Sequence, residues 1–336
     1  EEIGVKYKVN SFLREKQSNT TAEWKYYFDK DFGESGAFVR KHLKSENVDV
    51  LIDMSKEAKN YPLFQLAGYG FNKDTSIFYY TSFPYGDEAY FDIQTVFVDL
   101  KTLYRIDTVY GVVGSWFSNK DFCYFIFSNE DYYIKQCFYK TIGKNNSQKL
   151  FEAAADEVLM VQESNSGEST FLIVDNGGLS TQLYYIENSS PTIVNKVDEL
   201  NERAYLSSVE QYKGDDSFYI LSNENAPNFL LYKINPRLKE DSAKEIIIPE
   251  MSDKELVSAK LIDSLFVVET LDGINQDVEI FNPSSQLFSK VYISDDLHSS
   301  SVKEIKDGIV TIKYETYLNP TKYYEYTISD GSIRLI

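Results

Sequence analysis

The chain has 336 residues, with 52 acidic and 34 basic side chains and a formal net charge of −18. A phosphate backbone or an anionic membrane surface repels such a polyanion, so we expect it to bind neither nucleic acid nor membranes. Hydrophobic residues make up 43% and aromatic residues 15% of the chain, which is too apolar for a disordered protein. This length allows one large or two modest domains.

Short runs rich in Tyr, Phe, Val and Ile predict β-strands along most of the chain. Each run has the usual length of a strand, and polar turns separate the runs. In chain order the clearest runs are Ile77–Phe83, Thr95–Leu100, Phe122–Phe127, Phe171–Val174, Gln182–Ile186, Ser217–Leu221, Phe229–Ile234, Leu265–Glu269, Ile309–Tyr314 and Lys322–Tyr326.

Helical patterns are scarce in this sequence. Ile3–Lys16 has a weak helical periodicity. Leu150–Val161, which contains Ala153–Ala155, is the best candidate for a helix, although even there a helix is the less favoured prediction.

The strands repeat in pairs, and the repeats have a period in the forties. One central residue marks the second run of each pair: Val39, Val98, Phe138, Tyr185, Tyr232, Ile280 and Tyr326. A period of this size, filled by about four short strands, is typical of a β-propeller. The fifth repeat predicts strands at Leu206–Gln211, Ser217–Ser222, Phe229–Ile234 and Glu245–Ile248, and the seventh at Val302–Ile305, Ile309–Tyr314, Lys322–Tyr326 and Ile333–Ile336.

The predicted fold class is therefore all-β, a seven-bladed β-propeller of four-stranded antiparallel blades. Each blade is buried on both faces by its neighbours, which explains why every strand needs large apolar residues. Because one blade cannot bury its own faces, we expect residues 22–336 to form one propeller domain after a lead-in segment of residues 1–21. β-sandwiches of about 100 residues could use the same strands, but three of them would need linkers that the sequence lacks.

The motifs of nucleophilic catalysis and ion binding are incomplete. Gly33-Glu34-Ser35-Gly36 comes nearest to the nucleophile elbow Gly-x-Ser-x-Gly, but its second glycine is one place early, which predicts a turn. A calcium loop that starts at Asp29 would need glycine in place of Glu34 and glutamate in place of Arg40. The phosphate-binding pattern Gly-x-x-x-x-Gly-Lys-Ser/Thr does not occur.

Two acidic pairs fall in predicted turns. Asp215-Asp216 and Asp295-Asp296 are most simply read as solvated turn residues. A carboxylate pair for glycoside cleavage is set by space rather than by sequence, so a propeller glycosidase stays open, although nothing in the sequence favours it.

The chain has only two cysteines and two histidines and no cluster of them that could hold structural zinc. Cys123 and Cys137 lie on two apolar runs, where they could face each other across a hairpin as buried thiols. His42 and His298 are the only histidines, and a surface or packing role is the simpler interpretation of each. We predict no metal site, no cofactor and no catalytic residue in this chain. The sequence also lacks a signal-peptide pattern, and we expect a cytoplasmic protein.

Two segments in the last third resemble the prolyl oligopeptidase family. In Ser217–Tyr232, Ser222-Asn223 stands where the family has Thr-Asn, and Ala226-Pro227-Asn228-Phe229 matches its Ala/Ser-x-Asn-Phe/Tyr. Tyr314–Tyr326 is similar to the family's Tyr-Ser-Ser-x-x-Thr-Pro-x-x-x-Tyr-x-Tyr, and Gly331–Ile336 takes the place of the Gly-Glu and two leucines that follow it.

Earlier segments resemble oligopeptidase B, the branch of that family specific for basic residues. Val50–Asp53 followed by Leu66–Phe71 resembles the passage from its first to its second blade, and Gly114–Phe117 resembles the opening of its third blade. Ala153–Asp156 departs from the charged Asp-Glu-Arg link expected before the fourth blade. The resemblance extends from about Ala22 to Ile336.

The resemblance implies a propeller without catalytic residues, because the family carries its Ser, Asp and His on an α/β-hydrolase domain that would follow Ile336. That domain, in the same parent chain, and short peptides are the implied partners. The propeller would cover the active site and gate the access of short basic peptides, which a net charge of −18 would attract. Whether this chain is part of an enzyme stays open. The alternative is a stand-alone propeller that serves as a protein- or ligand-binding platform.

Overall fold

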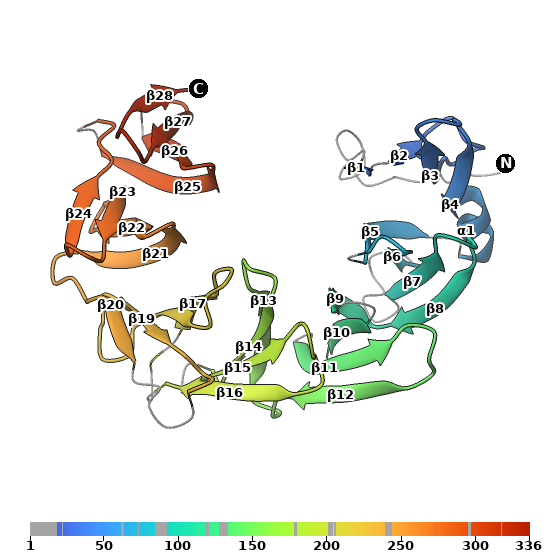
Figure 1. Cartoon of the computed structure of the whole chain (residues 1–336), viewed down its shortest axis with the longest axis horizontal. Coiled ribbons are helices and arrows are strands. Elements are labelled where there is room, and N and C mark those ends of the chain that lie inside the picture. The colour runs from blue at the N-terminus through green and yellow to red at the C-terminus, as the bar shows by residue number, and fades with distance from the viewer. Residues whose placement is uncertain are drawn as a thin grey trace. The chain divides into compact units, whose positions relative to one another are not determined.

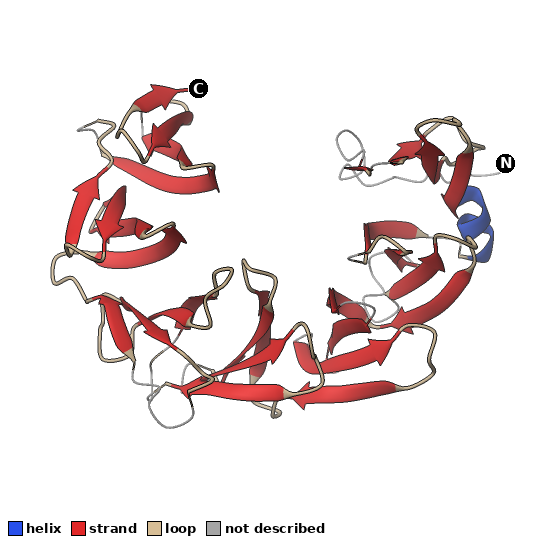
Figure 2. Ribbon diagram, viewed as in Figure 1, coloured by secondary structure: helices blue, strands red, loops and turns tan. Residues whose placement is uncertain are grey.

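The structure is a computed structural model in which β-strands dominate (Figure 2). It describes residues 19–21, 23–61, 64–72, 74–84, 93–118, 121–127, 134–177, 180–200, 204, 206–238, 244–294, 297–316 and 318–336. The chain divides into two compact units, one of Glu1–Leu159 with Asn188–Val194 and one of Met160–Glu187 with Asn195–Ile336.

Three four-stranded sheets follow one another in the first part of the chain, and in each sheet consecutive strands pair (Figure 1). The first sheet has β1 (Asn19–Thr20), β2 (Trp24–Asp29), β3 (Ala37–His42) and β4 (Val48–Asp53). The second has β5 (Gln65–Phe71), β6 (Ile77–Phe83), β7 (Gln94–Asp99) and β8 (Arg105–Tyr110). The third has β9 (Val112–Ser118), β10 (Asp121–Phe127), β11 (Ile134–Thr141) and β12 (Ser147–Glu152).

Two more four-stranded sheets and one eight-stranded sheet follow in the rest of the chain. They are β13 (Val158–Glu163), β14 (Ser169–Asp175), β15 (Thr181–Glu187) and β16 (Val194–Glu199), then β17 (Leu206–Glu210), β18 (Phe218–Ser222), β19 (Leu230–Ile234) and β20 (Glu245–Ile248). The eight-stranded sheet has β21 (Glu255–Ile262), β22 (Leu265–Asp272), β23 (Asn275–Asn282), β24 (Leu287–Lys290), β25 (His298–Lys306), β26 (Ile309–Thr316), β27 (Lys322–Thr327) and β28 (Ile333–Leu335). One parallel pair, Gln276 with Ser299, joins β23 to β25.

The seven marker residues of the sequence repeat all occupy equivalent strands. Val39, Val98, Phe138, Tyr185, Tyr232, Ile280 and Tyr326 lie on β3, β7, β11, β15, β19, β23 and β27, the third strand of each successive group of four. At four of these markers, Val39, Val98, Phe138 and Tyr232, the register with the fourth strand shifts by one residue. Such a bulge bends and twists a strand, so the repeat extends to local backbone shape.

Neighbouring sheets bury large apolar side chains between them within each unit. In the first unit, Phe38 of β3 stacks on Phe78 of β6 with 5.3 Å between ring centroids, and both rings are almost fully buried. In the second unit, Phe171 of β14 meets Phe218 of β18 edge-on at 4.9 Å. An aromatic ring buries a large apolar area, so these contacts explain why the strands are rich in Phe and Tyr.

Leu150–Val161 does not form a helix, in agreement with the favoured prediction for this segment. The segment forms the end of β12, a turn, and the start of β13. Lys135 fixes the turn, because its Nζ donates to the carbonyl oxygens of Ala154 at 3.2 Å and Ala155 at 2.9 Å. Carbonyls directed at one ammonium group are not available for helical hydrogen bonds. The other candidate, Ile3–Lys16, lies outside the described residues.

The single helix of the described residues is one that the strand pattern missed. Helix α1 (Met54–Asn60) begins directly after β4, and the Asp53 side chain accepts a hydrogen bond from the Lys56 backbone N–H at 3.1 Å. Aspartate is a preferred residue at this capping position, so Asp53 was a usable signal. The buried Met54 anchors the helix to the core of the first unit.

Candidate functional site

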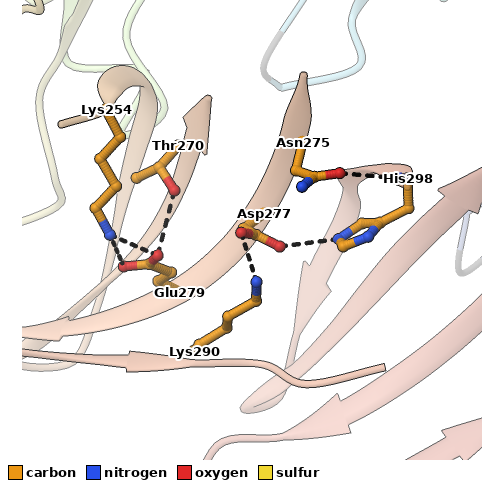
Figure 3. A network of polar contacts seen from close by, with 7 residues as sticks. All are labelled: Lys254, Thr270, Asn275, Asp277, Glu279, Lys290 and His298. Atoms are coloured by element: carbon orange, nitrogen blue, oxygen red, sulfur yellow. Dashed lines mark hydrogen bonds and ion pairs between the residues drawn. The ribbon is translucent and has the colours of Figure 1, made fainter. Parts of the chain in front are cut away.

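Two buried carboxylates on β23 are the centre of a polar network in the second unit (Figure 3). Asp277 and Glu279 are two residues apart on one strand, and both are more than nine-tenths buried. Burying a charge is costly unless a partner compensates for it, so the surrounding cations are needed for the fold.

Asp277 connects β23 to the strands on either side of it. Its Oδ2 lies 2.7 Å from Lys290 Nζ of β24, and its Oδ1 lies 2.8 Å from His298 Nε2 at the start of β25. The backbone N–H of His298 also donates to Asn275 Oδ1 at 3.2 Å. The His298 ring stacks on Tyr314 of β26 with centroids 5.1 Å apart. These contacts fix the His298 ring on two sides and also its backbone N–H.

Glu279 has its own set of partners. Lys254 Nζ lies 2.7 and 2.8 Å from its two carboxylate oxygens, and Thr270 donates to it at 3.3 Å. Asp277 and Glu279 are thus each neutralised by a cation. A glycosidase needs one protonated and one ionised carboxyl group that both face the substrate. Asp277 and Glu279 are instead buried and each is paired with a lysine, so they do not meet this requirement.

A pocket of about 250 Å³ lies beside this network. Its lining residues come from the turn between β22 and β23, the segment before β25, and the ends of β25 and β26: Ile274, Leu297, His298, Ser299, Glu315 and Thr316. Two cross-strand pairs of the β25–β26 ladder, His298 with Thr316 and Ser299 with Glu315, contribute four of these residues.

Glu315 is the ionisable carboxylate on the pocket wall. Its oxygens accept hydrogen bonds from Thr321 Oγ1 at 3.0 Å and lie 2.5 Å from Lys313 Nζ. The hydrogen bonds from Lys313 and Thr321 lower the pKa of Glu315 below its usual value. The carboxylate is therefore ionised at neutral pH.

The second histidine caps a turn. His42 Nδ1 lies 3.0 Å from the Ser45 backbone N, 3.3 Å from the Lys44 backbone N and 3.1 Å from Ser45 Oγ. Its ring meets Trp24 edge-on at 4.9 Å. The sequence did not reveal this serine–histidine contact. Because two backbone N–H groups converge on Nδ1, the imidazole accepts hydrogen bonds in an exposed turn. Its contact with Trp24 is the kind of packing role that the sequence predicts for His42.

The turn residues that the sequence singled out lie between strands, where the structure describes them. Gly33–Gly36 forms the turn between β2 and β3, as predicted. Asp215 accepts hydrogen bonds from the Ser217 backbone N–H and from Tyr219 Oη, each at 2.8 Å, and Asp216 pairs with Arg237. The pair Asp295-Asp296 lies outside the described residues.

The two cysteines are free and buried on the β10–β11 hairpin. Cys123 pairs with Tyr139 and Cys137 pairs with Phe125, so the thiols are diagonal neighbours rather than directly opposite each other. Burial raises the pKa of Cys137 to about 12 and raises that of Cys123 as well. Both side chains therefore stay protonated and unreactive at neutral pH.

In the described part of the chain, no three His, Cys, Asp or Glu side chains converge in a way that could hold a metal ion. No helix there has the length and apolar character that crossing a membrane requires.

Successive sheets of consecutive strands, packed on one another within each unit, are the arrangement of a β-propeller domain. A sequence profile described as "Prolyl oligopeptidase, N-terminal beta-propeller domain" matches residues 15–336. The chain therefore belongs to the prolyl oligopeptidase family and represents its N-terminal β-propeller domain.

Solved structures show the same fold at low sequence identity. Oligopeptidase B from Leishmania major is similar with a TM-score of 0.69 and 12% identity, covering 94% of this chain and 47% of that chain. Oligopeptidase B from Trypanosoma brucei gives 0.66 and 14%, with 94% and 47% covered. Prolyl oligopeptidase B from Galerina marginata gives 0.58 and 15%, with 93% and 49% covered. No curated protein sequence matches. The chain thus spans about half the length of these structures.

Proposed function

We propose that the chain is the non-catalytic propeller of an oligopeptidase B-like serine peptidase of the cytoplasm. It would cover the active site of an α/β-hydrolase domain and admit short basic peptides. The family match over residues 15–336 carries this proposal, together with the fact that the similar structures are about twice as long. Under this proposal, the partner domain performs all of the bond cleavage.

The proposed architecture is a seven-bladed propeller over residues 22–336, preceded by a lead-in segment of residues 1–21 whose last part, β1 (Asn19–Thr20), pairs with β2 in the first sheet. β21–β24 and β25–β28 each repeat the arrangement of the four-stranded sheets, and within the described residues β23 and β25 share a single register pair, Gln276–Ser299. Dividing the eight-stranded sheet at this pair gives two blades, which supports a total of seven.

The charge of the chain supports a preference for basic peptides. A net charge of −18 creates a field that concentrates cations near the surface, and salt screens this field. For the parent protein, we expect kcat/KM for an arginine-containing peptide to fall as salt is raised. A citrulline analogue, which has the same shape without the charge, should show a flatter profile. Parallel profiles would contradict electrostatic attraction.

The main experiment compares this chain with the parent protein. Each is mixed with a fluorogenic arginyl peptide and, separately, with a serine-directed fluorophosphonate probe. We expect no turnover and no labelling of this chain, and both reactions with the parent. Labelling of the purified chain would overturn the non-catalytic assignment. A reading frame that ends at Ile336 would overturn the peptidase proposal in favour of a stand-alone binding platform.

The gating role needs a separate test on the parent protein. One cleavage sequence is presented in free peptides of increasing length and inside an exposed loop of a folded host protein. We expect cleavage of the short peptides and none of the folded host. Equal cleavage of both would contradict a propeller that restricts access.

A further inference from the structure

We propose that the pocket between the ends of β25 and β26 binds the cationic side chain of a lysine or arginine in an extended peptide, with Glu315 as the counter-ion. The identity of the ligand as a peptide rests on the proposed function. The pocket itself is a feature of this chain alone, so it can be tested without the hydrolase domain.

The size of the pocket fits one side chain. Its volume of about 250 Å³ lies below the roughly 300–1,000 Å³ of pockets that enclose drug-sized ligands. Ile274 and Leu297 line the pocket and are 72% and 53% exposed, so they present apolar surface to solvent. The methylene stem of lysine or arginine can cover such surface while its charged end reaches a polar group.

Glu315 supplies the charge that would select a cation. Its side chain is 43% exposed, and its partner Lys313 lies on the same strand. An ion pair this exposed contributes little net free energy, because water and salt screen it. A guanidinium or ammonium group can therefore share or replace Lys313 at small cost. A guanidinium can in addition bind a carboxylate through two parallel hydrogen bonds.

The remaining wall is held rigidly by the buried network. His298 lines the pocket, and its Nε2 contacts Asp277 Oδ1 at 2.8 Å (Figure 3) while its ring stacks on Tyr314. Asp277 also neutralises Lys290, so this nearby ammonium is already paired. Asp277 is a positioning residue here. A preformed wall reduces the ordering cost of binding.

The test uses this chain with its isoleucine methyl groups labelled for NMR. The probe is the blocked peptide Gly-Ala-Arg-Ala-Gly, and its matched control carries citrulline in place of arginine. We expect a saturable shift of the Ile274 methyl signal with the arginine peptide and a much smaller one with citrulline. Glu315→Gln should raise the Kd about fivefold, the scale expected for one partly exposed charge pair.

Glu304→Gln is the matched variant, because Glu304 is an exposed carboxylate on the same ladder, paired with Thr311. It should change the Kd by less than about twofold. Three outcomes would overturn the proposal: equal binding of the citrulline peptide, equal effects of the two variants, or peptide binding without a shift at Ile274. Unchanged thermal unfolding of Glu315→Gln would show that the fold is intact. If the parent protein proves to be no peptidase while Ile274 still responds, the proposed function fails and the cation site remains.

Discussion

Tyr232 of β19 donates its phenolic hydrogen to Asp198 of β16, with 2.7 Å between Tyr232 Oη and Asp198 Oδ2. The bond links two neighbouring sheets of the second unit. Lys244 completes the contact, because its Nζ lies 3.0 Å from the same Asp198 oxygen and 4.9 Å from the centre of the Tyr232 ring. Tyr232 is also a marker of the sequence repeat, so one residue serves both the strand pattern and the contact between sheets.

Replacing Tyr232 by phenylalanine should weaken this contact between sheets. The ring stays in the core, but Asp198 loses a buried hydrogen bond to a charged acceptor. We expect the free energy of unfolding to fall by about 2 kcal/mol in urea titrations. Tyr184→Phe is the control, because Tyr184 Oη donates to a neutral group, Gln182 Oε1, on its own strand. That variant should lose about 1 kcal/mol or less, and equal losses would argue against a special role for Asp198.

Alkaline pH should destabilise the chain through its buried tyrosines. Burial, followed by the nearby carboxylates, raises the pKa of Tyr232 and Tyr219, and burial raises the pKa of Tyr212 to about 12. Above about pH 10 the unfolded chain releases these protons while the folded chain keeps them. The free energy of unfolding therefore falls with rising pH, by about 1.4 kcal/mol per pH unit for each such tyrosine.

Urea midpoints between pH 9 and 11.5 would measure this slope. Tyr212→Phe should reduce the slope of the free energy of unfolding against pH by the contribution of one tyrosine, whatever its effect on stability at neutral pH. Tyr104→Phe, at a side chain that is 75% exposed, controls for the loss of a tyrosine hydroxyl as such. A slope that Tyr212→Phe does not alter would show that other groups, such as lysines, cause the alkaline loss.

Much of the fold could be predicted because one structural unit repeats along the chain. Val39, Tyr232 and the other markers recur because each lies on the third strand of a successive group of four antiparallel strands. The turn at Ala153–Glu157 could not be predicted, because Lys135, far away in sequence, binds its carbonyl groups. The three alanines there made Leu150–Val161 a candidate helix, although not the favoured prediction, and the contact with Lys135 gives the turn its shape.

The thiols of Cys123 and Cys137 should resist modification in the folded chain. With a pKa of about 12, only about one Cys137 side chain in 10⁴ is a thiolate at pH 8. We expect no reaction with Ellman's reagent over minutes in buffer, and two reactive thiols per chain in guanidinium chloride. Rapid labelling of the native chain would contradict the burial of these side chains.

Removing Asp277 should be more damaging than removing its exposed partner. Asp277→Ala leaves His298 and Lys290 facing each other without their carboxylate, and breaking a buried pair in this way costs about 3 kcal/mol. Lys290→Ala leaves Asp277 bound to His298. Because the Lys290 side chain is 45% exposed, we expect a loss of about 1 kcal/mol or less. Urea unfolding of both variants measures the two losses of stability, and a larger loss for Lys290→Ala than for Asp277→Ala would contradict this prediction.

The candidate site was much less predictable than the fold. Asp277 and His298 are 21 residues apart, on strands β23 and β25 that are not consecutive in the chain. A pattern of alternating apolar residues shows which residues form strands but not which polar side chains meet on neighbouring strands. The same limit applies to the pocket, since Ile274 and Glu315 come from different turns and strands.

The glycines near Ser35 can be tested as structural residues. Gly36 has a φ of +78°, and a Cβ atom there would lie 2.6 Å from Cζ of Phe28 and 2.9 Å from the carbonyl oxygen of Asp29. Gly143 has a φ of +82° but nothing within 4 Å of its Cβ position. Gly143→Ala should therefore cost about 1–2 kcal/mol from backbone strain alone. Gly36→Ala should cost at least about 1 kcal/mol more because of the steric clash.

Paired urea titrations of these two glycine variants would separate crowding from backbone conformation. Ser35→Ala completes the set and should have no measurable effect on stability or on any peptidase activity of the parent protein, because Ser35 lies in the β2–β3 turn. Equal losses for Gly36→Ala and Gly143→Ala would mean that Phe28 moves aside, and the glycine would then be explained by its φ alone. A loss of parent activity in Ser35→Ala with unchanged stability would instead restore Gly33–Gly36 as a catalytic candidate.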